Sequence, residues 1–363
     1  MTLNRTRAKL KQSLPLAFLY PEYRSFWVGM LASVSGFQMM QFGQIVLVHH
    51  LTESPIFLGL LGLSSGIPAI LLNPLGGVYA DRWDKRRLIV FTQTITALLL
   101  VCLAILTWLG MVNAWHCLFI AFLVGSVEAF DQSARRALFP HLVPRSALVS
   151  AVALNSAIWS GTRMIAPAAA GIIIAVFNPA FAFFAASFGF ALMAYFIYSL
   201  KPIPSVAATR VSPAKEMLEG FNFIRRNSPF PFLIVMTFFN SFFGISYIYL
   251  MPVFAIDILK IGTIGQGWLL SISGVGSLVT TVWLGTAKTI NNKSVLVIGG
   301  GIGFGLSIAA FGLTSRFLPS YGIALLLMLV IGLTSSTYMI SIQSSLQLLV
   351  PDNMRGRVMG FFG

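Results

Sequence analysis

The sequence predicts an all-α membrane protein with many spans, because of its composition, its repeated apolar runs and one polar break between them. Hydrophobic residues make up 57% of the 363 residues and charged residues only 9%, whereas a soluble domain carries about 25% charge. A helix needs about 20 apolar residues to cross the hydrocarbon. Ten runs of about that length can be placed, separated mostly by short turns.

The predicted spans lie at residues 25–50, 56–80, 88–110, 115–138, 147–176, 180–200, 230–256, 264–286, 294–315 and 320–349. The polar break follows the sixth span. It divides the chain into an N-terminal six-helix bundle with a basic tail (1–200), a linker (201–228) and a second bundle (229–363).

The linker predicts an amphipathic helix on the inner membrane surface. Ser212 and Pro213 form a cap followed by a first-turn proline. Apolar residues then recur at helical spacing, while charged residues fill the other face, as in helices that lie in the membrane interface.

The distribution of basic residues predicts the orientation of the chain. With a cytoplasmic N-terminus, all but three of the 24 Lys and Arg fall in the tail, the linker or the inner loops, the exceptions being Arg163, Lys260 and Arg316. Membrane proteins concentrate positive charge on the cytoplasmic side. The net charge of +14 is therefore explained by topology, and we expect no nucleic-acid partner.

A weak internal repeat predicts two parallel six-helix units. Leu142-Val143-Pro144 follows the fourth span and Leu349-Val350-Pro351 follows the tenth, so equivalent segments are six spans apart. The chain reaches only the start of an eleventh span, at 357–360. We therefore expect ten full spans and a C-terminal bundle that is truncated in this chain.

The turn between the second and third spans carries a dense set of glycines and charges. Glycines at a helix end allow close backbone approach, an acid and a base can bridge helix ends, and a basic cluster belongs on the cytoplasmic side. These groups are Gly76, Gly77, Asp81, Arg82, Lys85, Arg86 and Arg87.

This pattern resembles the loop between helices 2 and 3 of the major facilitator superfamily. The resemblance implies the major facilitator fold, two six-helix bundles that rock about a midplane cavity. Asp84 stands where that family usually has glycine, which leaves the geometry of the turn open.

Two charged residues within spans are candidates for proton coupling. Glu128 on the fourth span and Arg163 on the fifth lie at depths that a long arginine side chain can bridge. A carboxylate that alternates between a partner and a proton is a coupling device. The alternative is a static pair that aligns the two helices.

Asp131, near the inner end of the fourth span, precedes Arg135 by one helical turn. The simple interpretation is a local pair on the helix surface. The superfamily resemblance implies instead that Asp131 joins Asp81 and Arg82 in a latch of the cytoplasmic gate.

The fifth span contains Gly161, Pro167 and Gly171 among small residues, a composition that permits close helix contact. It resembles the helix-5 motif of exporting antiporters, with Ala166 and Ala170 in place of expected glycines.

Neutral polar residues outline a possible substrate cavity. Gln38, Gln41 and Gln44 recur every three positions on the first span and share a face. For each of these residues, contact between helices is the alternative to contact with substrate. Further candidates are Asn73, Asn155, Trp159, Asn240 and Tyr247.

Other functions find little support in the sequence. It contains no phosphate-binding P-loop and no nucleophile turn, so we expect no enzyme. The four histidines lack metal-ligand spacing, and His49 and His50 are interpreted as polar tips at the outer interface. We expect no metal and no cofactor, with the proton gradient as energy source.

The run from Asp131 to Pro144, together with 355–360, resembles the enterobactin-exporter and macrolide-efflux branch. That resemblance implies a monomeric transporter in a bacterial inner membrane that exports a small amphipathic molecule, of drug or siderophore type, by proton antiport. An uptake or lysophospholipid transporter of the same fold is an alternative. A membrane receptor that transports nothing is another.

Overall fold

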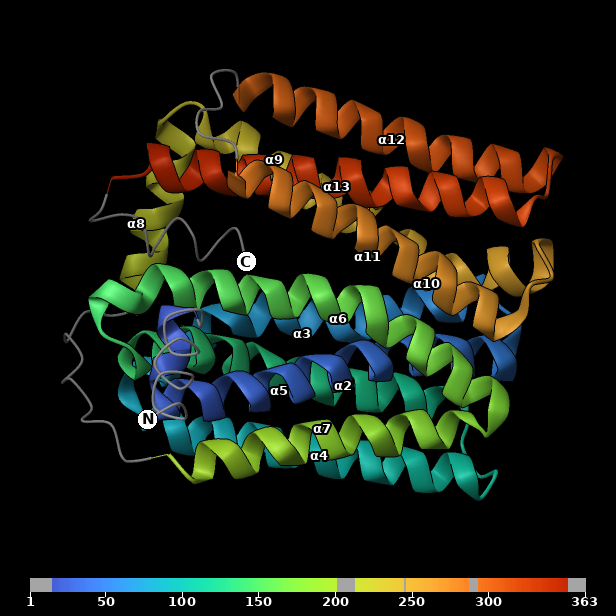
Figure 1. Cartoon of the computed structure of the whole chain (residues 1–363), viewed down its shortest axis with the longest axis horizontal. Helices are drawn as coiled ribbons and strands as arrows, with labels where there is room; N and C mark the ends of the chain where they lie inside the picture. Colours follow the sequence, from blue (N-terminus) through green and yellow to red (C-terminus); the bar gives the residue numbers. More distant parts are fainter. Residues whose placement is uncertain (1–14, 201–212, 245, 287–292, 352–363) are drawn as a thin grey trace, which may run out of the picture.

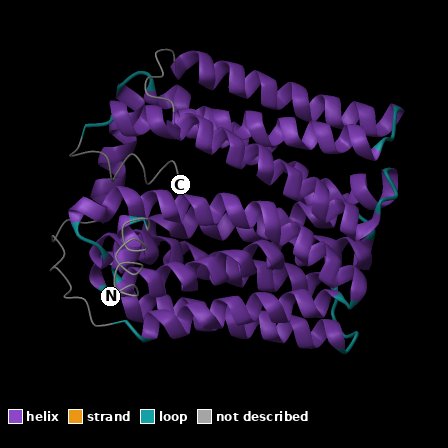
Figure 2. Ribbon diagram, in the orientation of Figure 1, coloured by secondary structure: helices purple, strands orange, loops and turns teal. Residues whose placement is uncertain are grey.

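The computed structural model describes residues 15–200, 213–244, 246–286 and 293–351, which are almost entirely helical (Figure 2). In this part of the chain, ten spans are long and apolar enough to cross a membrane, which confirms the predicted number. The first group of helices consists of α2 (Pro21–Thr52), α3 (Pro55–Arg82), α4 (Lys85–Trp108), α5 (Ala114–Leu138), α6 (Leu148–Val176) and α7 (Pro179–Tyr198).

The second group begins with a broken span. Two π-helical segments, η4 (Asn240–Gly244) and η5 (Val253–Ile258), follow α9 (Phe230–Phe239) and α10 (Ser246–Pro252). The span predicted at 230–256 is present as one membrane-length segment from Phe230 to Ile258, and the π-turns within it, which are frequent at functional sites, were not predicted. The group continues with α11 (Gly262–Thr286), α12 (Lys293–Phe317) and α13 (Tyr321–Leu349).

The helix α8 (Pro213–Arg226) lies within the predicted linker and runs across the other helices at one end of the molecule (Figure 1). Its Ile224 is buried in a core formed with α9, α12 and α13. We call this end the α8 end and the opposite one the far end. Ser212 and the expected start of an eleventh helix at 357–360 lie outside the described residues.

Local sequence explains where several helices begin. Prolines open α2, α3 and α7, where a missing N–H costs nothing. At the far end, the Asn113 side chain accepts a hydrogen bond from the His116 N–H at 2.9 Å, and the His116 ring accepts one from Asn113, which forms a capping box. Short capped turns therefore keep neighbouring helices antiparallel.

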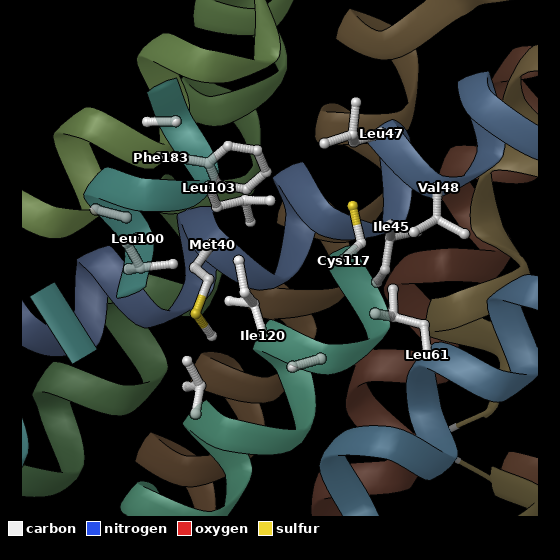
Figure 3. Close-up of a cluster of buried hydrophobic side chains, with 14 of the residues drawn as sticks. Met40, Ile45, Leu47, Val48, Leu61, Leu100, Leu103, Cys117, Ile120 and Phe183 are labelled. Carbon is white, nitrogen blue, oxygen red and sulfur yellow. The ribbon is translucent and has the colours of Figure 1, made fainter. Parts of the chain in front are cut away.

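Four buried cores are arranged differently at the two ends. One core unites α2, α3, α4, α5 and α7 of the first group (Figure 3). At the α8 end, each group has a core of its own. Toward the far end, a shared core contains Phe42 and Ile174 from the first group with Met251 and Leu269 from the second. The two groups are therefore packed together away from α8.

Candidate functional site

A cavity of about 290 Å³ lies where the two groups meet. The first group contributes α2, α3 and α5, and the second contributes η4 and α10. Its walls are mainly apolar, with a few converging polar groups, a composition typical of small-molecule sites. The polar groups that line it include Gln41, Gln44, Ser65, Glu128 and Tyr249.

Two glycines bring α3 and α5 together, and one of them, Gly125, lines this cavity. A Cβ on Gly76 would overlap the backbone oxygen of Ala129, and one on Gly125 would lie 2.6 Å from the Ser65 oxygen. The close approach predicted for Gly76 is thus confirmed. Because Gly125 lies three residues before Glu128, this contact sets the depth of the Glu128 side chain against α3.

The structure does not bring Glu128 and Arg163 together. Glu128 Oε1 accepts a hydrogen bond from Gln132 Nε2 at 2.9 Å, and no ion pair among the described residues includes Glu128. Arg163 is exposed, and its backbone lies beside Gly274 of α11. The expected pair is absent because α6 packs against α2 and α11 and not against α5. Similar depth along two helices therefore does not bring the two side chains together.

Asp131 is the centre of a buried polar network. Its Oδ2 lies 2.5 Å from Arg135 Nε, and its Oδ1 accepts a hydrogen bond from Thr92 Oγ1 at 2.7 Å. Arg135 donates to Ser33 Oγ at 2.8 Å, and Ser33 in turn donates to Gln93 at 2.9 Å. The predicted local pair is present, and it ties α5 to α2 and α4.

The loop between α3 and α4 is described only in part. Asp84 caps α4 by accepting from Arg86 N–H at 2.9 Å, with φ of −60°. The backbone at this position is therefore not left-handed, so an acidic residue can stand where the superfamily usually has glycine. The Arg86 side chain donates to the backbone oxygens of Ile197, at 3.0 Å, and Tyr198, which joins α4 to the end of α7. Outside the described side chains lie Gly77, Asp81 and Arg82.

The other polar candidates lie in several places. Gln38 is half-buried but does not line the cavity, and Asn155 accepts a hydrogen bond from Tyr23 at 3.2 Å. The Trp159 ring meets the Phe37 ring edge-on at 6.5 Å. Asn240 lines a separate groove of about 720 Å³ on the second group. Asn73 is half-buried on α3.

The helix-5 motif faces the second group. Pro167 is buried within α6, and a Cβ on Gly171 would lie 2.8 Å from a backbone oxygen of α11. From the other side, Cβ atoms on Gly267 and Gly274 of α11 would lie 2.7 Å from backbone atoms of α6. Gly161 of the motif faces open space. The motif thus lies at the interface between the groups, where glycines allow the backbones of α6 and α11 to approach closely.

Polar contacts also join the two groups. His49, interpreted from the sequence as an interfacial tip, is instead buried and paired with an acid of the second group. The contacts are His49 Nε2 to Asp257 Oδ1 at 3.1 Å, the Ser65 and Tyr249 hydroxyls at 3.2 Å, and Ala168 N–H to Ser271 Oγ at 3.1 Å.

The sequence profile of the family described as "Transmembrane secretion effector" matches residues 15–362. The chain belongs to this family of major facilitator transporters. Members of the family are transporters and not enzymes.

Several curated relatives of the family align with long stretches of the chain. The "Staphyloferrin A transporter" of Staphylococcus aureus is 25% identical over 64% of this chain, which spans 59% of the length of that relative. "Macrolide efflux protein A" of Streptococcus pyogenes is 24% identical over 80% of this chain and 73% of its own length. The "Enterobactin exporter EntS" of Shigella boydii serotype 4 is 21% identical over 96% of this chain and 83% of its own length.

Solved structures confirm the fold. The nucleoside transporter NupG superposes with a TM-score of 0.72 at 15% identity, over 94% of this chain and 86% of that chain. A D-xylose-proton symporter gives 0.72 at 14% identity with the same coverage. The protein is therefore a multi-pass membrane protein with the major facilitator fold.

Proposed function

We propose that this transporter exports a small amphipathic molecule, of drug or siderophore type, by proton antiport with alternating access. The observation that carries the proposal is the cavity between the two groups, whose one acidic lining residue, Glu128, has no ion-pair partner among the described residues. The printed functions of three relatives, staphyloferrin A transport, macrolide efflux and enterobactin export, support the class of substrate.

Glu128 is the proposed protonatable group. A carboxylate within a membrane span is costly when charged and unpaired. Either a bound proton or a bound substrate can compensate this charge, so the two are expected to compete. Arg163 remains part of the proposed coupling site, and it lies beside α11 of the second group rather than in an ion pair with Glu128. Its charge acts where the second group meets the first.

The α8 end is the proposed cytoplasmic side of an inner membrane. Positive charge is enriched there, as expected for cytoplasmic loops, and the separate cores at this end leave the groups free to part. Asp131, Asp81 and Arg82 are proposed to latch this side when the groups close. Asp131 is already held by Arg135 and Thr92.

The test is efflux from cells that express the protein, using dyes, macrolides and catecholate siderophores with and without a protonophore. We expect Glu128→Gln to reduce efflux to the level of protonophore-treated cells. The matched control is Glu53→Gln, the same change on an exposed residue beyond the cavity, which should leave efflux unchanged.

Export that survives Glu128→Gln but not the protonophore would contradict the role of Glu128. Export of nothing in the panel would contradict the exporter proposal. The same cells and reconstituted vesicles are then tested for uptake and for lysophospholipid movement, which the apolar cavity walls also suit.

A further inference from the structure

The cavity between the two groups carries charge of one sign. Glu128 is the one charged residue that lines it, and its lining includes no Lys, Arg or His in the part of the chain that the structure describes. The Glu128 side chain is half-buried, and the hydrogen bond that it receives from Gln132 is made to Oε1. When ionised, this carboxylate therefore gives the cavity a single negative charge.

The basic residues that follow Glu128 on its own helix do not neutralise it. Arg135 is paired with Asp131, at 2.5 Å between Nε and Oδ2. Arg136 is exposed and lies eight residues further along α5, about 12 Å along the helix axis at 1.5 Å per residue. The charge of Glu128 is thus left to be matched by a ligand.

The segments that surround Glu128 across the cavity are uncharged. The lining segments lie within 37–44 of α2, 61–69 of α3 and 240–252 of η4 and α10, and their described residues include no Asp, Glu, Lys, Arg or His. Arg163 of α6 does not line the cavity, and its backbone lies beside Gly274 of α11. Neither group of helices therefore supplies a positive charge to the walls.

Two aromatic residues add to the negative character of the walls. Phe37 of α2 and Tyr249 of α10 line the cavity from opposite groups. The face of an aromatic ring carries partial negative charge and attracts organic cations. The Tyr249 hydroxyl contacts the Ser65 hydroxyl at 3.2 Å, and the Phe37 ring meets the Trp159 ring edge-on. These contacts position both rings without a ligand.

We propose that the cavity binds a compact organic cation with one positive charge and an apolar body, and that the ammonium group lies beside Glu128. An anionic cargo would place a second negative charge beside this carboxylate, away from bulk water, where like charges repel strongly. A second positive charge on the cargo would meet no acid. The volume of about 290 Å³ is near the lower limit of small-molecule pockets, about 300–1,000 Å³, which favours a compact cargo.

This inference rests on the proposed function, because it specifies the cargo of the same cavity. Of the two types of cargo proposed above, it selects the drug type that carries an amine over a siderophore that carries carboxylates. A proton and an organic cation both neutralise Glu128, so each excludes the other from the site. Exchange of one for the other is the step that an antiporter needs.

The inference can be tested by equilibrium dialysis of the purified full chain in lipid nanodiscs with three matched radiolabelled probes. The first is 4-phenylbutyl-trimethylammonium, whose positive charge does not titrate. In the second, carbon replaces the nitrogen, which removes the charge and keeps the shape. The third is 5-phenylpentanoate, which is an anion. Binding is measured in mildly alkaline solution, where protons compete least, and binding to empty nanodiscs is subtracted.

We expect the cation to bind about tenfold more tightly than its neutral isostere, and the anion to bind least. Glu128→Gln should lower the affinity for the cation about tenfold and leave that for the isostere unchanged. Glu53→Gln, on an exposed residue, is the matched control and should change neither. Phe37→Leu should weaken binding of the cation about threefold more than binding of the isostere, and it serves if Glu128→Gln does not fold.

Three results would overturn the inference. The first is binding of the isostere or the anion as tight as that of the cation in the parent protein. The second is an equal loss of cation and isostere binding in Glu128→Gln, which would make Glu128 a structural support of the cavity. The third is binding of none of the probes.

The binding assay and the efflux assay fail separately. Binding of the cation by a protein that exports nothing from cells would contradict the export proposal and support the assignment of the cargo. Export of catecholate siderophores by a protein that does not bind the cation would support export and overturn the assignment of the cargo.

Discussion

The two ends of the molecule place their polar contacts differently. At the α8 end, the network around Asp131 and Arg135 stays within the first group, and so does the link from Arg86 to α7. At the far end, His49 pairs with Asp257 across the two groups. Buried cores follow the same division, since the groups have separate cores beside α8 and share one toward the far end.

This difference separates two tasks. Contacts within one group keep that group rigid, whereas contacts between groups determine how often the groups separate. Substitutions that break contacts within one group should therefore lower the free energy of unfolding, also where a residue such as Asp131 has a proposed role in the gate. Substitutions at the junction of the groups should also change the balance between conformations, and the following variants test this division.

The largest effect is expected for Asp131→Asn. It leaves the Arg135 charge buried without its acid, and breaking a buried pair costs about 3–5 kcal/mol. Chemical denaturation of the purified protein in detergent measures the loss. Asp84→Asn is the control, because asparagine also caps helices and the residue is half-exposed. Equal stability of the two variants would contradict a structural role for the network.

A smaller loss is expected for Gly274→Ala. The added Cβ would lie 2.7 Å from the Met164 backbone, and overpacking of this kind costs about 1–3 kcal/mol. The same denaturation assay detects the loss. A wider separation is detected as the distance between spin labels on Leu51→Cys of α2 and Ile264→Cys of α11, both exposed, with the native cysteines replaced by alanine. Gly285→Ala on the same helix meets open space, so it should not destabilise. If Gly274→Ala behaves like Gly285→Ala, the close contact of α6 with α11 is wrong.

Two neighbouring arginines provide a third test. Arg86→Gln removes hydrogen bonds to two backbone oxygens at the end of α7 and should cost about 1–2 kcal/mol of unfolding free energy. Arg87→Gln removes only an exposed contact with Asp84 at 3.7 Å and should have no measurable effect. Denaturation curves that shift equally for both variants would show that charge in this loop matters more than the link to α7.

The smallest effect is expected for Tyr249→Phe. It removes the hydroxyl contact with Ser65 at 3.2 Å between the groups, worth about 0.5–1 kcal/mol. The change should appear in the spin-label distance distribution as more open molecules, with little change in the free energy of unfolding. Tyr195→Phe, on an exposed ring of α7, is the control. A pure loss of stability without a shift in distance would contradict a contact that controls opening.

Most of the fold could be predicted from the sequence, because span length and apolar content depend on the membrane and not on tertiary contacts. The ten spans follow from that information, and the close approach at Gly76 follows from the absence of a side chain there. The π-turns of the seventh span do not, since span length and apolar content carry no information about them.

The candidate site was predicted less completely. Depth along a helix can be calculated from sequence, but the direction of a side chain depends on which helices pack together. Glu128 and Arg163 have compatible depths, yet α6 packs against α2 and α11, and the Arg163 backbone lies beside Gly274 of α11. Tyr249 and Asp257 were missed for the same reason, since their partners lie on helices of the other group, far away in the sequence.

The glycine contacts between α6 and α11 have a mechanical consequence. Side chains of α11 bond firmly to α13, through Ser277 to Ser336 at 2.6 Å and Thr280 to a backbone oxygen at 3.0 Å. Toward α6, α11 presents Gly267 and Gly274, and Ser271 Oγ accepts a hydrogen bond from Ala168 N–H at 3.1 Å. Glycines have no side chains that interdigitate with the facing helix, so few side-chain contacts oppose a small shift of α11 along α6. Movement of α11 along α6 therefore has to break the hydrogen bond from Ala168 to Ser271, while the hydrogen bonds to α13 make α11 and α13 move together.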